Sequence, residues 1–157
     1  MTAEPDRRKL RFETLDEIVQ EVDRLADMEV ETTGKYSYGQ ILEHLARILD
    51  VASGHLTTEK PNLMIRMVAR VLRPKMLRSP MQAGYKLPDS VQDLFWPSEE
   101  VDVRSGQKHF HEAIERFRNR DPLPPHPIFG KMNRDQSDQL QCRHCELHLG
   151  FVHPVES

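Results

Sequence analysis

Apolar residues in the first third of the chain recur at intervals of three and four positions, which is the spacing of one face of an α-helix. One such stretch covers residues 15–25, and the preceding Thr14-Leu-Asp-Glu17 has the spacing of a capping box. A second stretch covers residues 41–52, follows a box of the same kind at Ser37-Tyr-Gly-Gln40, and is closed by Gly54. The pattern predicts two amphipathic helices, of which the second is the clearest in the chain.

Two further helices are predicted in the second half. Ser98-Glu-Glu is expected to cap a helix that runs to Arg118, in spite of Gly106 in its interior. Asn133-Arg-Asp-Gln136 repeats the cap pattern and predicts a last helix that reaches Phe151.

The middle of the chain is apolar and basic at once. Residues 62–77 have helical spacing, and Pro74 should end or kink this helix. Its basic residues include Arg66, Arg70 and Arg73. Two interpretations stay open: a packed helix whose arginine stems reach water, or a docking surface on a non-catalytic interaction module. Residues 78–97 and 121–127 are interrupted by proline and are predicted to be irregular, the first as a loop or lid.

Strand signals are scarce, apart from short pieces such as Val101-Asp-Val103. Four long helices, one shorter extra helix and a long irregular connection between the second and third long helices predict an all-α protein built as a four-helix bundle. We expect a single domain over residues 1–157, with a short flexible N-terminus over about residues 1–10.

Composition narrows the function classes. The 157 residues carry 22 Lys+Arg against 25 Asp+Glu, and this net charge of -3 gives no general reason to expect a nucleic-acid binder. The first residues lack the apolar core of a signal peptide, and no stretch approaches the ~20 apolar residues of a membrane span. A soluble cytoplasmic protein is therefore expected.

The unusual count is eight histidines. His144 and His148 lie one helical turn apart, at the margin of an apolar stripe formed by Leu140, Leu147 and Phe151. His44 lies on the inward side of the second helix, between Ile41 and Ile48. Neighbouring side chains could satisfy these imidazoles, but a divalent metal bound by all three, with a water on the open position, is our leading hypothesis. His55, His109 and His111 are expected at the surface, whereas His126 and His153 are left as loop residues.

Cys142-Arg-His-Cys145 is a competing constellation on the last helix. A thioredoxin-like role needs a βαβ context that the pattern lacks, and structural zinc needs a second ligand pair. Cys145 borders the proposed histidine site, so it stays open as a fourth ligand or a redox-sensitive neighbour. We interpret both thiols chiefly as incidental.

The chain has a capped helix with a single histidine (Tyr36-Ser-Tyr-Gly-Gln-Ile-Leu-Glu-His44) and a last helix with His144-x-x-x-His148. With these motifs it resembles the DinB/YfiT-like superfamily of metal-binding four-helix bundles over most of its length. His126-Pro-Ile-Phe-Gly130 and Met81-Gln-Ala-Gly-Tyr-Lys-Leu-Pro88 are similar to a narrower branch known as a domain of unknown function.

By this resemblance His44, His144 and His148 are the three metal ligands. Leu147 replaces the first histidine of the branch's His-His pair, and Phe151 replaces a glutamine that could have supported the ligands. The resemblance implies zinc or nickel, and a metal-dependent hydrolase or a thiol-dependent transferase acting on a small molecule. The expected partners are that substrate and a second copy of the chain in a homodimer, and no nucleic acid.

Overall fold

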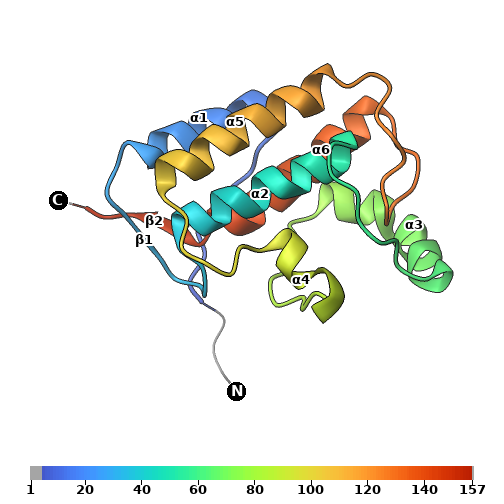
Figure 1. Ribbon diagram of the computed structural model, residues 1–157, viewed down its shortest axis with the longest axis horizontal. Helices are drawn as coiled ribbons and strands as arrows, with labels where there is room; N and C mark the ends of the chain where they lie inside the picture. The colour runs from blue at the N-terminus through green and yellow to red at the C-terminus, as the bar shows by residue number, and fades with distance from the viewer. Residues whose placement is uncertain (1–4, 157) are drawn as a thin grey trace.

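The computed structural model describes residues 5–156, and within this range the chain forms six helices and two short strands (Figure 1). In chain order they are α1 (Leu15–Ala26), β1 (Val30–Thr32), α2 (Tyr38–Ser53), α3 (Leu63–Arg78), α4 (Asp89–Phe95), α5 (Val103–Asn119), α6 (Arg134–Leu149) and β2 (Val152–Pro154). The prediction of a mostly helical protein is confirmed. None of the helices in this range is long and apolar enough to cross a membrane.

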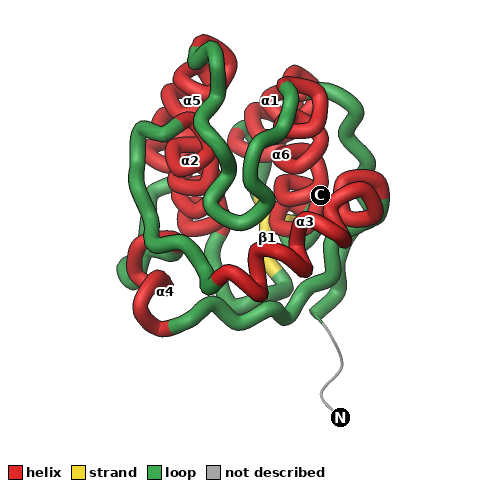
Figure 2. Tube along the Cα trace, turned by 90° about the vertical axis from the view of Figure 1, so that its right-hand side faces the viewer, coloured by secondary structure: helices red, strands yellow, loops and turns green. Residues whose placement is uncertain are grey.

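Helices α1, α2, α5 and α6 lie side by side, with α3 and α4 outside this group (Figures 1 and 2). The main core lies between the four helices, where apolar side chains of each meet. Its largest fully buried apolar side chains are Ile18, Val22, Leu25, Leu42, Leu45, Leu49, Phe110, Ile114, Phe117 and Leu149. A smaller cluster of Leu77, Phe129 and Leu140 joins α3 to α6 and to the loop before it.

The predicted helix starts are confirmed for α2 and α6, where the boxes at Ser37 and Asn133 are complete. At α1 only half of the box forms. The Thr14 hydroxyl accepts from the Glu17 N–H, but the Glu17 carboxylate accepts from the N–H of Glu13 instead of that of Thr14. Gly54 ends α2 with φ 80°, the left-handed conformation that favours glycine.

Helix α5 begins at Val103 with Asp102 as its N-cap, so the predicted start at Ser98 is wrong. The reason is tertiary: residues 98–101 stay non-helical and cross the start of α2. A Cβ on Gly39 of α2 would lie 1.7 Å from the Val101 carbonyl oxygen, so only glycine permits this crossing. Val101-Asp-Val103 is accordingly no strand.

Glycine also explains why α2 and α5 pack so closely further along. A Cβ on Gly106 of α5 would lie 2.9 Å from the Gly39 carbonyl oxygen and 2.9 Å from Leu42 Cβ. Gly106, which lowers the helix propensity of α5, is therefore a residue that allows α5 to approach α2 closely.

The same two helices share a polar network. His109 of α5 contacts the carboxylates of Glu43 at 2.7 Å and Asp50 at 2.9 Å, and Arg116 contacts Asp50 at 2.8 Å. Burial lowers the pKa of His109, but hydrogen bonds and the charges of Glu43 and Asp50 outweigh burial and leave it raised. The expectation that His109 is a surface residue is wrong, because it bridges two helices.

Two strands were missed because each has three residues. Val30–Thr32 pairs antiparallel with Val152–Pro154, so the last helix ends at Leu149, before the predicted Phe151. The N-terminal segment packs beside this pair: the Arg8 N–H donates to the Gly150 carbonyl at 2.7 Å. The predicted flexible N-terminus falls partly on residues 1–4, which lie outside the described range.

The middle of the chain differs most from expectation. Helix α3 continues through Pro74 to Arg78, and the predicted irregular connection 78–97 contains α4. Leu77 is the one buried residue of α3, and Ala69 and Met76 are packed beside it. The interpretation of a packed helix therefore holds only for this side, because most of the apolar residues are exposed. Residues 121–127 form neither helix nor strand, as expected.

Candidate metal centre

The three predicted histidines meet between α2 and α6. His44 Nε2 lies 3.3 Å from His144 Nε2, and His148 Nε2 lies 3.1 Å from the same atom. All three ligand atoms lie within 4.8 Å of one another. The helical spacing of His144 and His148 puts both on the α6 face that His44 approaches, so the structure brings together the set expected from the sequence.

These spacings fit a metal site. Three imidazole nitrogens that bind a tetrahedral zinc ion at about 2.0–2.1 Å lie about 3.3–3.4 Å apart. The contacts at 3.3 and 3.1 Å are close to that separation. In the described residues no cysteine or carboxylate joins the cluster, which leaves a three-histidine donor set.

Hydrogen bonding alone serves this cluster poorly. His44 Nδ1 donates to the Phe95 carbonyl at 2.7 Å, so a neutral His44 presents a bare lone pair at Nε2. A proton on His144 Nε2 would have to be shared between His44 and His148. His144 Nδ1 is buried and has no hydrogen-bond partner. A cation is the one partner that suits all three Nε2 lone pairs at once.

The electrostatics favour the neutral, ligating form of each ring. Burial lowers the pKa of His144 to about 4, and the nearby His126 adds to the effect. Burial lowers the pKa of His44 and His148 well below the usual range, with a further contribution from the neighbouring imidazoles. All three are therefore neutral at pH 7, which is the state that binds a metal.

Aromatic side chains form one wall of the site, and sequence reasoning missed them. Trp96 is stacked between Tyr36, at a centroid distance of 3.8 Å, and His44, at 3.7 Å. It also meets the edge of His148 at 5.2 Å. A usable signal was the sole tryptophan of the chain standing before Pro97, which restricts Trp96 to an extended conformation.

The two cysteines do not contribute ligands. Both are buried and free. Burial raises the pKa of Cys142 to about 11 and that of Cys145 well above the usual range. Both are thiols at neutral pH, whereas redox attack needs a thiolate, and neither Sγ joins the cluster of histidine nitrogens.

Helix α6 is buried on more than the predicted apolar stripe. Leu140 is buried, but Leu147 and Phe151 are only partly buried. Arg143 and Glu146 are buried as a pair, 2.9 Å apart. Glu146 also accepts the backbone N–H of Phe12 at 2.7 Å, so this ion pair anchors the N-terminal segment to the helix that carries the site.

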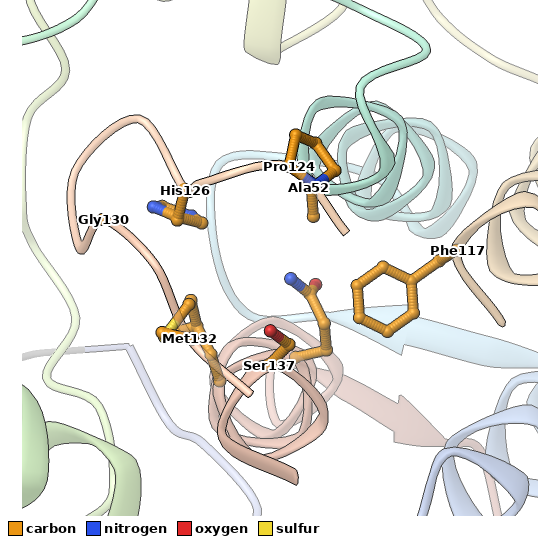
Figure 3. Close-up of a pocket in the computed structure, with 9 residues that line it drawn as sticks. Ala52, Phe117, Pro124, His126, Gly130, Met132 and Ser137 are labelled. Atoms are coloured by element: carbon orange, nitrogen blue, oxygen red, sulfur yellow. The ribbon is translucent and has the colours of Figure 1, made fainter. Parts of the chain in front are cut away.

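A small enclosed pocket lies beside α6, below the linker that leads to it (Figure 3). His126 and Phe117 line opposite sides, and Ser137 of α6 lies at its floor (Figure 3). Gln141 of α6 also lines the pocket. His126 Nδ1 accepts from the N–H groups of Ile128 and Phe129, and burial lowers the pKa of His126 to about 4. The pocket has room for about one water molecule.

The remaining histidines lie apart from the site. His55 is exposed, as expected. His111 is partly buried and contacts Asp23 at 2.6 Å, and His153 contacts the Thr33 hydroxyl at 3.3 Å. Each of the latter two has a protein partner.

Comparison with known proteins gives a family without an assigned reaction. No curated protein and no solved structure matches the chain. A family model described as a protein of unknown function (DUF1569) matches residues 4–155. The match confirms the resemblance to a domain of unknown function, and the chain belongs to the DUF1569 family.

Proposed function

We propose that this protein is a metal-dependent enzyme with a DinB-like four-helix bundle, in which His44, His144 and His148 bind zinc or nickel. The observation that carries the proposal is the convergence of three Nε2 atoms from α2 and α6, with contacts of 3.3 and 3.1 Å. The side-by-side arrangement of α1, α2, α5 and α6 supports the bundle (Figure 2).

The chain supports the donor set in three ways. The Phe95 carbonyl fixes the His44 ring through Nδ1, which directs Nε2 toward the other two histidines. Trp96 covers the face of that ring. His44 is 3% exposed, whereas His144 and His148 are partly exposed, so solvent reaches the donor set from the α6 side.

Three histidine ligands leave one position open, and a divalent metal held this way lowers the pKa of water or a thiol toward neutrality. The proposed reaction is hydrolysis of a small molecule or transfer to a small thiol. Phe151 supplies no polar group where the resembling branch has glutamine. Its ring lies beneath Arg7, 6.0 Å from the guanidinium carbon.

Metal analysis tests the proposal. The full chain, purified without a nickel column, is expected to contain one zinc or nickel per molecule. His44→Ala, His144→Ala and His148→Ala should each lose most of it, whereas the exposed His55→Ala should retain it. Wild-type protein without stoichiometric metal, which also fails to take up added zinc or nickel, would refute the metal site.

Activity separates the enzyme from a non-catalytic module. Metal-loaded protein should accelerate either ester hydrolysis or the addition of a small thiol to an electrophile, and the three alanine variants should not. A protein that binds metal but shows neither activity across a panel of both substrate types would refute the enzyme and leave a structural metal site.

A further inference from the structure

Helix α3 exposes most of its apolar residues to solvent, unlike an ordinary surface helix. Its largest apolar side chains face solvent: Leu63, Met64, Ile65, Met67, Val68, Val71 and Leu72 are each 47–79% exposed. They account for seven of the ten exposed large apolar residues in the described range. Such a cluster over about 14 Å of one helix marks an interaction surface.

The opposite face of α3 is held firmly, so the exposure is built into the fold. Arg73 donates to the carbonyls of Phe129 and Lys131, both at 3.0 Å. The Arg70 guanidinium fills the space beside Gly130, where a Cβ would lie 2.8 Å from its Nε. Arg70 and Arg73 therefore lie on the side of α3 that contacts the protein, whereas the seven apolar residues lie on the side that faces water.

Charge is segregated around this surface. Residues 60–88 contain seven of the 22 basic residues and none of the 25 acidic ones. The rest of the chain therefore has ten more acidic than basic residues. Lys60, Lys75 and Lys86 are exposed within the basic segment, as is Tyr85, at 80%.

We propose that the outward face of α3 (residues 63–72), with the basic residues of segment 60–88, docks on an anionic lipid bilayer. An apolar helix face with cationic residues is the form of an interfacial helix, and each Lys or Arg near an anionic surface strengthens binding. Screening over about 8 Å at physiological salt lets this local positive charge act despite the net charge of -3.

The charge distribution disfavours a second copy as the occupant. A two-fold contact places the same patch of both subunits together, so the exposed basic residues of two segments that contain no acidic residue would meet. An anionic bilayer satisfies the apolar face and the basic flank together.

Vesicle co-sedimentation of the full chain tests this. Wild-type protein should bind vesicles of phosphatidylcholine with about 30% phosphatidylglycerol, and bind pure phosphatidylcholine at least tenfold more weakly. Raising the salt to about 1 M, where the screening length is ~3 Å, should release it. His44→Ala should bind like the wild type, which separates this result from the metal proposal.

Matched variants locate the surface. Met64→Ser/Val71→Ser changes two side chains that are 76% and 79% exposed, so folding should be unaffected, and should weaken binding at least tenfold. Met28→Ser/Val155→Ser makes the same type of change at exposed sites elsewhere and should not. Lys60→Gln/Lys75→Gln/Lys86→Gln should also weaken binding at least tenfold, unlike Lys9→Gln/Lys35→Gln/Lys108→Gln.

Three outcomes overturn the proposal. The first is wild-type protein that fails to bind anionic vesicles. The second is equal loss of binding in test and control variants. The third is a dimer in sedimentation velocity that Met64→Ser/Val71→Ser dissociates, without vesicle binding, because the face then belongs to a second copy.

Discussion

Replacing Trp96 by leucine tests whether the aromatic wall positions the metal ligand. The indole stacks on Tyr36 with an interplanar angle of 9° and on His44 with one of 3°. An aromatic pair contributes about 0.5–1.5 kcal/mol beyond the area it buries. Loss of both pairs should lower the free energy of unfolding by about 1–3 kcal/mol, measured by chemical denaturation of the metal-free protein.

The same variant should also weaken metal binding. The residue before Trp96 supplies the carbonyl that fixes His44 Nδ1 at 2.7 Å, so a looser segment releases the ring. Losing such a support costs about 10–100-fold in metal affinity. Competition against a chromophoric chelator measures this for zinc, and Trp96→Phe, which keeps an aromatic plane, should retain most of the affinity. A Trp96→Leu affinity within about twofold of the wild type, or an equal loss in Trp96→Phe, would refute a positioning role.

Three further predictions concern the helices around the site. Because folding raises the pKa of His109, protonated His109 stabilises the folded state. This contribution is fully present below pH 6.5, the usual pKa of histidine, and is lost as the pH rises through the raised pKa. His109→Gln should therefore cost about 1.5–3 kcal/mol at pH 6 and flatten this pH dependence in urea titrations. Equal pH slopes in both proteins would contradict the raised pKa of His109 beside Glu43 and Asp50. Gly106→Ala should lower stability by more than 1 kcal/mol, because the new Cβ meets backbone at 2.9 Å, although alanine favours helix; an unchanged melting temperature would contradict the close approach. Cys142 and Cys145 should react with a thiol reagent only as fast as the protein unfolds, and rapid labelling of the native state would contradict their burial.

The sequence predicted helix boundaries correctly where neighbouring residues determine them through capping. The boxes at Ser37 and Asn133 and the glycine at position 54 fix where helices begin or end, and all three act as expected. The predicted helix start at Ser98 was wrong because residues 98–101 pack against Gly39 in a non-helical conformation. That packing depends on a residue about sixty positions away, which periodicity does not register.

The site was predictable to the extent that its residues share helix faces. His144 and His148 are four apart on one helix, so their proximity follows from helical geometry. The prediction that they meet His44 rested on the inward position of all three histidines and on the resemblance to the DinB/YfiT-like superfamily. Phe95 ends the short helix α4 and Trp96 directly follows it, in a part of the chain where the sequence predicts only an irregular connection. Their place beside His44 depends on how this connection packs against α2, which periodicity does not show.

Helix α3 was predicted as a helix, but its packing differs from what the sequence pattern indicates. Periodicity predicts an amphipathic helix correctly but does not say which face turns inward, and the usual assumption is that the apolar one does. Here Arg73 finds two backbone carbonyls on the protein, and these hydrogen bonds hold the polar face inward. The apolar face is then exposed to solvent. Each exposed Met, Leu or Val loses the stabilisation of about 1.5–3 kcal/mol that its burial would contribute. A fold that bears this cost at seven neighbouring positions implies a surface that covers them, and the charge of the flanking segment selects an anionic one.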